Sequence, residues 1–238
     1  MAGPAWARVF SAAAPGPTVP VMITTAPHLL HVDSSIQGDR SVTRALSRRV
    51  VDGWLAANPG GSVNYRDLAA SPPPHLGADA WDARFVPADQ HSDAHAEAFA
   101  LSRELIGEVE AADAIVLGLP LYNFGPPTSV KAWVDHLVFP GLSVKDDMSE
   151  GLLTGRRVIA VVARGGSYAE GTPRHGWDHA EQWLTHILSM VGLTPEFVAI
   201  ELTVAEVRPA LAHLQPQAEA SRAAAHSAID KIWARAAA

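Results

Sequence analysis

The sequence predicts an α/β fold in which helices cover both faces of a parallel sheet. Short apolar runs rich in β-branched residues alternate with longer stretches whose apolar residues recur at helical spacing. The runs Ala114–Leu119 and Arg157–Ala163 are almost continuously apolar, which favours strands that are buried on both sides. Five such strands, each followed by a helical stretch, predict a doubly wound five-stranded parallel sheet.

Each element follows from a local signal. The strands are the short apolar or alternating runs, which we place at Leu29–Asp33, Ser62–Leu68, Ala114–Leu119, Arg157–Ala163 and Glu196–Leu202. The helices have apolar residues three and four apart, and we place them at Ser41–Ala57, Ala94–Ala111, Thr128–Val138, His179–Val191 and Gln217–Ala236. Pro120 ends the third strand, and the prolines at 72–74 begin a long irregular connection. No internal repeat interrupts this order.

Composition excludes several classes of protein. The chain has 238 residues, 18 Lys and Arg, 25 Asp and Glu, a net charge of −7 and no cysteine. Without cysteine there is no disulfide scaffold, thiolate zinc site, iron–sulfur cluster or cysteine nucleophile. An acidic chain without a basic tract does not suit nucleic acid, and no apolar run is long enough to cross a membrane. We therefore expect a soluble cytoplasmic protein.

The first 27 residues differ from the rest of the chain. They contain one charged residue, Arg8, and five prolines, and the segment 15–17 reads Pro-Gly-Pro. These features predict a disordered N-terminal arm, with Met22 as an alternative start and a partner-wrapping arm as the other interpretation. Residues 28–238 then form a single domain.

Open parallel sheets bind ligands at the carboxyl ends of their strands, so the loops that follow the strands are the places to inspect. After the first strand, Ser34 and Ser35 precede a glycine turn, and Ser41 and Thr43 open a helix. Hydroxyl groups and the free N–H groups of a helix N-terminus together favour a phosphate. No glycine-rich dinucleotide or Walker motif is present. Taken alone, Ser41 is equally consistent with a simple helix cap.

The next two loops suit a flat ligand. Residues 120–128 read Pro-Leu-Tyr-Asn-Phe-Gly-Pro-Pro-Thr, which combines aromatic faces with an amide. A planar ring such as an isoalloxazine needs that mixture, although the aromatics could instead pack on the sheet edge. Residues 163–168 read Ala-Arg-Gly-Gly-Ser-Tyr, where glycines allow close backbone approach and Arg164 would bring a positive charge. The alternative for this segment is a flexible hinge.

Together these motifs resemble the FMN-dependent NAD(P)H azoreductases and quinone reductases of the flavodoxin-like superfamily. The shared features are Ser-Ser followed after five residues by Ser-x-Thr, the Pro-x-Tyr-Asn-Phe-x-x-Pro loop with Lys-Ala-Trp-x-Asp after it, and Arg-Gly-Gly-x-Tyr-x-x-Gly. The resemblance covers about Leu29–Leu202. It implies the strand order 2-1-3-4-5, bound FMN, NADH or NADPH as donor, ping-pong hydride transfer to a quinone or azo compound, and a homodimer with its flavin near the interface.

The resemblance also implies which residues bind the cofactor. Ser35, Ser41, Val42 and Thr43 would hold the phosphate. The flavin ring would be lined on one side by Leu121, Tyr122, Asn123 and Phe124, and at its other edge by Ala163, Arg164, Gly165 and Gly166. Tyr168 or a nearby histidine is a candidate proton donor to the acceptor, although water could serve equally well, and no protein nucleophile is required.

The sequence departs from the family pattern in three places, and the third of them concerns the electron acceptor. Leu121 replaces a common methionine, and Gly125-Pro126-Pro127 replaces a looser segment. Phe139 stands in place of an arginine and Val144 in place of an aromatic, which makes these two residues, with Tyr168, the expected acceptor pocket. They predict a preference for compact neutral acceptors over bulky sulfonated dyes.

Two other functions stay open at this point. One is a pathway-specific reductase or isomerase of a conjugated metabolite, and the other is a non-catalytic electron carrier. The 11 histidines include the pairs His91/His95 and His175/His179, but without a metalloprotease motif we interpret them as surface residues and expect no metal.

Overall fold

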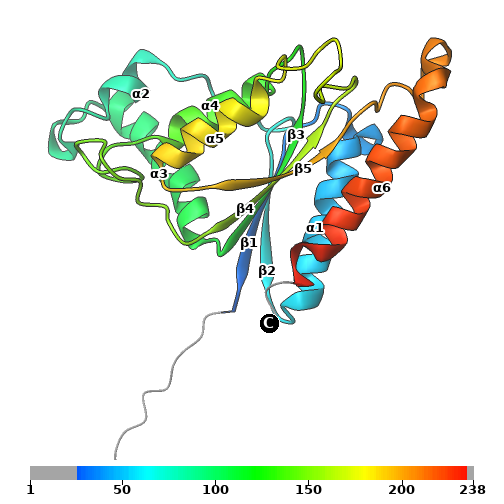
Figure 1. The fold of residues 1–238 in the computed structure, drawn as a ribbon. Coiled ribbons are helices and arrows are strands. Elements are labelled where there is room, and N and C mark those ends of the chain that lie inside the picture. Colours follow the sequence, from blue (N-terminus) through cyan, green and yellow to red (C-terminus); the bar gives the residue numbers. More distant parts are fainter. Residues whose placement is uncertain (1–25, 235–238) are drawn as a thin grey trace, which may run out of the picture.

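The computed structural model describes residues 26–234, which form one five-stranded parallel sheet between two layers of helices (Figure 1). The strands are β1 (His28–Asp33), β2 (Ser62–Asp67), β3 (Ala114–Pro120), β4 (Arg157–Ala163) and β5 (Pro195–Ile200). Their order is β2-β1-β3-β4-β5, and every pairing is parallel. The predicted fold and strand order are confirmed. Most of the expected arm at 1–27, Met22 and the last residues of the expected final helix lie outside the described residues.

Helices α1 (Val42–Ala57) and α6 (Gln215–Ile232) cover one face of the sheet. Helices α3 (Asp93–Ala111), α4 (Thr128–Leu137) and α5 (Ala180–Met190) cover the other. Strand β3 is buried along its whole length because it lies at the centre of the sheet between these layers. Trp54 of α1 packs in the core on the side of the sheet covered by α1 and α6. Trp133 of α4 packs in the core on the side covered by α3, α4 and α5.

The expected irregular connection after β2 contains a short helix, α2 (Ala78–Asp82), and a 3-10 turn at Ala88–Gln90. Helix α2 buries only Ala80 and follows Gly77. A helix of five residues is too short to show a hydrophobic period, which is why the sequence did not reveal it. The five strands and the other five α-helices lie within a few residues of their predicted bounds, as expected for helix and strand ends, whereas the 3-10 helix at Pro209–Leu214 was not predicted.

The strand order reverses between β1 and β3: β2 is added on one side of β1, and β3, β4 and β5 are added on the other. Asp33, the last residue of β1, pairs with Asp67 of β2 on one side and with Gly118 of β3 on the other. The carboxyl ends of β1 and β3 therefore form the switch point at which ligands of such sheets bind. Across residues 26–234, we find no helix that combines the length and the apolar character needed to span a membrane.

Candidate functional site

A cleft of about 180 Å³ lies at this switch point. The loops that follow strands β1, β3, β4 and β5 contribute to it. The residues that line the cleft are Ser35, Gln37, Ser41, Val42, Thr43, Pro120, Leu121, Tyr122, Ala163, Gly165, Thr203 and Val204. None of these side chains is charged. Any anion in the cleft must therefore be held by hydroxyl groups, backbone N–H groups and the helix dipole.

The N-terminus of α1 supplies the polar end of the cleft. Ser41 is the N-cap: its Oγ accepts a hydrogen bond of 3.2 Å from the backbone N–H of Arg44, and it lies 3.0 Å from Oγ1 of Thr43. Ser35, Ser41 and Thr43 are all at least 95% buried, although they border the cleft. Ser41 thus caps the helix and also lines the cleft.

The loop after β3 supplies an aromatic wall held in an unusual backbone conformation. Tyr122 and Gly125 exchange two backbone hydrogen bonds, of 2.9 and 3.1 Å, across a two-residue turn. Both turn residues are left-handed, Asn123 with φ 48° and Phe124 with φ 71°. A phenylalanine rarely adopts this region, and such strain tends to persist where a ligand needs the geometry.

Across the cleft, the hydroxyl of Tyr122 lies 3.3 Å from Oγ of Ser35 and accepts a hydrogen bond of 3.2 Å from the N–H of Ile36. The loop after β3 and the loop after β1 are therefore joined directly. Leu121 and Tyr122 line the cleft, whereas Asn123 and Phe124 lie beyond its rim.

The loop after β4 approaches the loop after β5 closely. A Cβ atom on Gly165 would lie 3.2 Å from a methyl group of Val204, so the glycine allows this contact. Of the four residues predicted here, Ala163 and Gly165 line the cleft, and Arg164 and Gly166 do not. Thr203 and Val204 were missed because the loop after the fifth strand carries no glycine pair or hydroxyl cluster that marks it in the sequence.

Arg164 requires a correction. Its guanidinium is surrounded by three carboxylates, at 2.6 Å from Asp178, 2.5 Å from Glu181 and 3.1 Å from Glu201. The expected free positive charge beside the ligand is therefore absent at this residue. Burial, together with the charges of Asp178 and Glu201, raises the pKa of Glu181 above its ordinary value despite the arginine. The side chain instead ties the loop after β4 to the start of α5 and the end of β5.

An exposed aromatic cluster lies beside this loop. The ring of Phe124 meets Trp177 edge-on at 5.3 Å and Tyr168 at 6.4 Å. The N–H of His179 also donates to the carbonyl of Phe124 at 2.9 Å, which fixes the two loops against each other. Trp177 is 50% exposed, and the sequence analysis did not select it because it stands outside every motif.

Phe139 and Val144 do not form an acceptor pocket. Phe139 is 4% exposed and packs edge-on against Phe99 at 5.5 Å in the core, and Val144 is completely buried. Both residues follow α4 in a loop that folds back on itself through hydrogen bonds between Phe139 and Ser143. Their apolar character is explained by the core, so the predicted role of these two side chains in acceptor choice is wrong.

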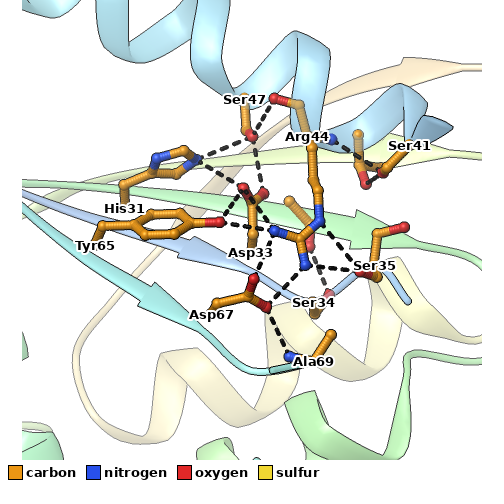
Figure 2. A network of polar contacts seen from close by, with 12 residues as sticks. His31, Asp33, Ser34, Ser35, Ser41, Arg44, Ser47, Tyr65, Asp67 and Ala69 are labelled. Carbon is orange, nitrogen blue, oxygen red and sulfur yellow. Dashed lines mark hydrogen bonds and ion pairs between the residues drawn. The ribbon is translucent and has the colours of Figure 1, made fainter. Parts of the chain in front are cut away.

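Beneath the cleft, on the α1 side of the sheet, lies a network of polar side chains that the sequence did not predict (Figure 2). The carboxylate of Asp33 accepts hydrogen bonds from Ser47 at 2.9 Å and Tyr65 at 3.2 Å, and lies 3.4 Å from His31. Burial by itself raises the pKa of Asp33, but the hydrogen bonds from His31 and Ser47 and the charge of Arg44 outweigh it and leave this pKa lowered. Asp33 is therefore a buried carboxylate, ionised at neutral pH.

Asp67 completes the network. Arg44 contacts both of its carboxylate oxygens, at 2.7 and 2.8 Å, and this pair lowers the pKa of Asp67, with help from the N–H groups of Ala69 and Ala70. A carboxylate whose pKa is lowered by folding stabilises the protein above its unfolded pKa of about 3.9, and that stabilisation is lost as the pH falls.

We expect Asp67→Asn to lower the thermal midpoint at pH 7, because Arg44 then loses an ionic partner. The difference between wild type and variant should shrink as the pH falls through about 4, because the carboxylate of the unfolded wild-type chain then takes up a proton while the folded carboxylate, whose pKa is lowered, is still ionised. Melting curves at pH 7, 5, 4 and 3 test this. Asp52→Asn, at an exposed position of α1, the helix that carries Arg44, is the control. A wild-type advantage that stays constant down to pH 3 would contradict the assignment.

The described residues fit a phosphate-bearing planar group. Buried hydroxyls and a helix N-terminus lie at one end of the cleft, apolar and aromatic groups lie at the other, and no carboxylate lines it to repel an anion. This is the composition that FMN requires.

Comparison with known proteins agrees with the geometry. A family model described as the flavodoxin-like fold matches residues 27–232. The FMN-dependent NADH:quinone oxidoreductase of Frankia alni is 46% identical over 204 residues, which cover 85% of this chain and 97% of that protein. The protein of the same name from Streptomyces avermitilis is 42% identical over 200 residues, covering 83% and 91%.

Solved structures share the fold. An azoreductase from Bacillus anthracis superposes with a TM-score of 0.75 at 22% identity, over 87% of this chain and 98% of that one. An FMN-dependent NADH-azoreductase from the same species, in complex with FMN, gives 0.71 at 18% identity, over 89% and 100%. The chain therefore belongs to the family of the flavodoxin-like fold, together with these FMN-dependent NADH:quinone oxidoreductases.

Proposed function

We propose that the protein is an FMN-dependent NADH:quinone oxidoreductase that also reduces azo compounds. The observation that carries this proposal is the uncharged cleft at the switch point, whose polar end is a helix N-terminus with buried hydroxyls. The names of the relatives at 40–46% identity support both the cofactor and the donor.

In this proposal, Ser35, Ser41, Val42 and Thr43 hold the phosphate of FMN. Leu121 and Tyr122 contact the ring system, with Asn123 and Phe124 at its rim, and the backbone of residues 163–166 borders its other edge. Thr203 and Val204 join the set because they line the same cleft. Hydroxyls and backbone N–H groups here are preorganised donors, and such donors cost no reorganisation when charge develops nearby.

FMN, when bound, would supply the redox chemistry, namely hydride acceptance from NADH and delivery of the two electrons to a second substrate. The residues of the chain would bind the cofactor and orient it. The strained turn at Asn123 and Phe124 sets the aromatic wall, and the Tyr122 contacts with Ser35 and Ile36 fix that wall against the phosphate loop. No nucleophile is needed, which agrees with the absence of cysteine.

Steady-state NADH oxidation tests the function. With a compact quinone we expect rapid consumption of NADH, with an azo dye slower consumption, and without an acceptor only the slow reaction with oxygen. An electron carrier would not oxidise NADH at a comparable rate by itself. A pathway-specific enzyme would show poor kcat/KM for every quinone and dye tried.

We further propose that the aromatic cluster of Phe124, Tyr168 and Trp177 receives the acceptor. Trp177→Ala should lower kcat/KM for a planar quinone about 2- to 10-fold, since a lost aromatic contact costs about 0.5–1.5 kcal/mol. Trp177→Phe should retain most of the activity, because it keeps a ring at this position. Equal activity of the alanine and phenylalanine variants with the wild type would remove Trp177 from the site.

Tyr168 remains our candidate for proton donation to the acceptor, supported by its place beside Phe124. Tyr168→Phe removes only the hydroxyl group. A lower kcat in this variant is the expected result, and an unchanged kcat would leave water as the proton source.

We also propose a homodimer. Phe139 cannot support it, because that side chain is buried, but Trp81 and Phe85 are 52% and 65% exposed on and beside α2. Exposed large apolar groups of this kind often mark an interface. Light scattering at micromolar concentration should give twice the chain mass, and a monomer with normal turnover would refute the proposal. Since NADH is a cytoplasmic metabolite, we place the enzyme in the cytoplasm.

A further inference from the structure

Arg44 does not line the cleft, but its guanidinium contacts Ser35, which does. Arg44 belongs to the first turn of α1, and its side chain reaches toward Ser35, which follows β1, and Asp67, which ends β2 (Figure 2). The residue is not in any motif that the sequence analysis selected, and the proposed function does not use it.

The five N–H groups of the guanidinium make five hydrogen bonds. Nε and Nη2 donate to the carbonyl oxygen of Ser35 at 3.2 and 2.8 Å, and Nη1 donates to the hydroxyl of Tyr65 at 2.8 Å. The remaining two go to the carboxylate of Asp67 at 2.7 and 2.8 Å. An arginine has five such donors in a fixed plane, so this side chain is fully satisfied and its geometry is over-determined.

The contact of Arg44 with the Ser35 carbonyl also determines the direction of the Ile36 N–H, which belongs to the same peptide group. In a trans peptide the C=O and the following N–H point in opposite directions. A Ser35 carbonyl held toward Arg44 therefore directs the N–H of Ile36 away from Arg44 and toward the cleft. The structure agrees, since this N–H donates to the hydroxyl of Tyr122, a residue of the cleft wall, at 3.2 Å.

The anchors of Arg44 are themselves fixed. Asp67 accepts hydrogen bonds from the N–H groups of Ala69 and Ala70, at 2.9 and 3.1 Å. Tyr65 also donates to the buried carboxylate of Asp33 at 3.2 Å. The guanidinium is consequently tied to the ends of both β1 and β2, which are parts of the rigid sheet.

We propose that Arg44 is a positioning residue for phosphate recognition: by holding the Ser35 carbonyl, it fixes the peptide plane between Ser35 and Ile36 and so aims the Ile36 N–H into the cleft. Because the cleft contains no charged side chain, the phosphate depends on correctly aimed hydrogen-bond donors. This inference rests on the proposed function, in that it takes the phosphate of FMN to lie at this loop.

The test compares FMN with riboflavin, which has the same ring but no phosphate. The purified flavin-loaded protein is equilibrated with FMN and riboflavin at varied ratios, and the bound flavins are separated from the free flavins and quantified. The measured quantity is the preference for FMN, that is, the affinity of the protein for FMN divided by its affinity for riboflavin. Because the two flavins differ only in the phosphate, this ratio reports recognition of the phosphate. A general loss of stability would weaken binding of both flavins and leave this preference unchanged.

We expect Arg44→Gln to reduce the preference for FMN at least tenfold. Arg44→Lys should reduce it by a smaller factor, because an ammonium group keeps the charge but cannot hold Ser35, Tyr65 and Asp67 together. Arg48→Gln, an exposed arginine one helical turn further along α1, is the matched control and should stay within twofold of the wild type. If Arg44→Gln does not fold, Asp67→Asn weakens the same anchor and should reduce the preference about threefold.

A preference that stays within twofold of the wild type in Arg44→Gln, or in Asp67→Asn where that variant replaces it, would overturn the inference and leave the proposed function intact. A wild-type protein that binds neither flavin, or binds riboflavin as well as FMN, would overturn the proposed function and with it the inference. The two failures are thus distinguishable in one experiment.

Discussion

Replacing Thr43 by valine should weaken FMN binding about 5- to 30-fold. Valine has nearly the shape of threonine, so the buried side chain, which is 1% exposed, keeps its packing and loses only its hydroxyl. A hydrogen bond to a charged phosphate contributes about 1–2 kcal/mol, and 1.4 kcal/mol corresponds to a factor of ten. Quenching of flavin fluorescence on titration with the protein measures the affinity.

Ser41→Ala should give a loss of similar size, together with a lower melting temperature, because this serine also caps α1 and a lost cap costs about 1 kcal/mol. Thr185→Val serves as the control, since Thr185 donates its hydroxyl to the carbonyl of Glu181 within α5, outside the cleft. Unchanged affinity for FMN in the Thr43→Val/Ser41→Ala double variant would show that this loop only caps α1 and does not bind the phosphate.

Gly118→Ala should be among the most destabilising single substitutions in the chain. A Cβ atom on Gly118 would lie 2.3 Å from Oδ1 of Asp33, and both residues are buried on neighbouring strands of the sheet. The carboxylate cannot move without breaking its contacts with Ser47 and Tyr65. We expect a loss of about 2–3 kcal/mol, which lowers the melting temperature by roughly 5–10 °C in a chain of this length.

Gly107→Ala is the matched control. Gly107 lies inside α3, and a Cβ atom there would meet nothing within 4 Å. Alanine at this position should stabilise the protein by about 0.5–1 kcal/mol, because glycine in a helix interior is unfavourable. If the two variants melted at the same temperature, the close approach of Asp33 would not be the reason for a glycine at position 118.

The sheet was predictable because its strands carry their own signal. Strands β3 and β4 are continuous apolar runs, and their burial on both faces is what such runs predict. The cleft was predictable for a related reason, since the ends of parallel strands meet at one edge and place Ser41, Leu121 and Gly165 together.

Two kinds of residue were not predictable. Phe139 and Val144 were placed by position in a loop, but the direction of a loop side chain depends on how the loop folds back, and here both turn into the core. Arg44, Asp33 and Asp67 come together through the pairing of β1 with β2 and the packing of α1, and no pattern along the chain marks such a network. Thr203 and Val204 belong to the same class, because only the tertiary structure brings them to the cleft.

The most direct test of the central claim is the identity of the bound cofactor. The protein is purified without added flavin, denatured by heat, and the released compound is separated by chromatography and quantified against the protein. We expect FMN, at one molecule per chain when binding is saturated. Recovery of FAD, or a colourless protein that stays colourless after incubation with FMN, would contradict it.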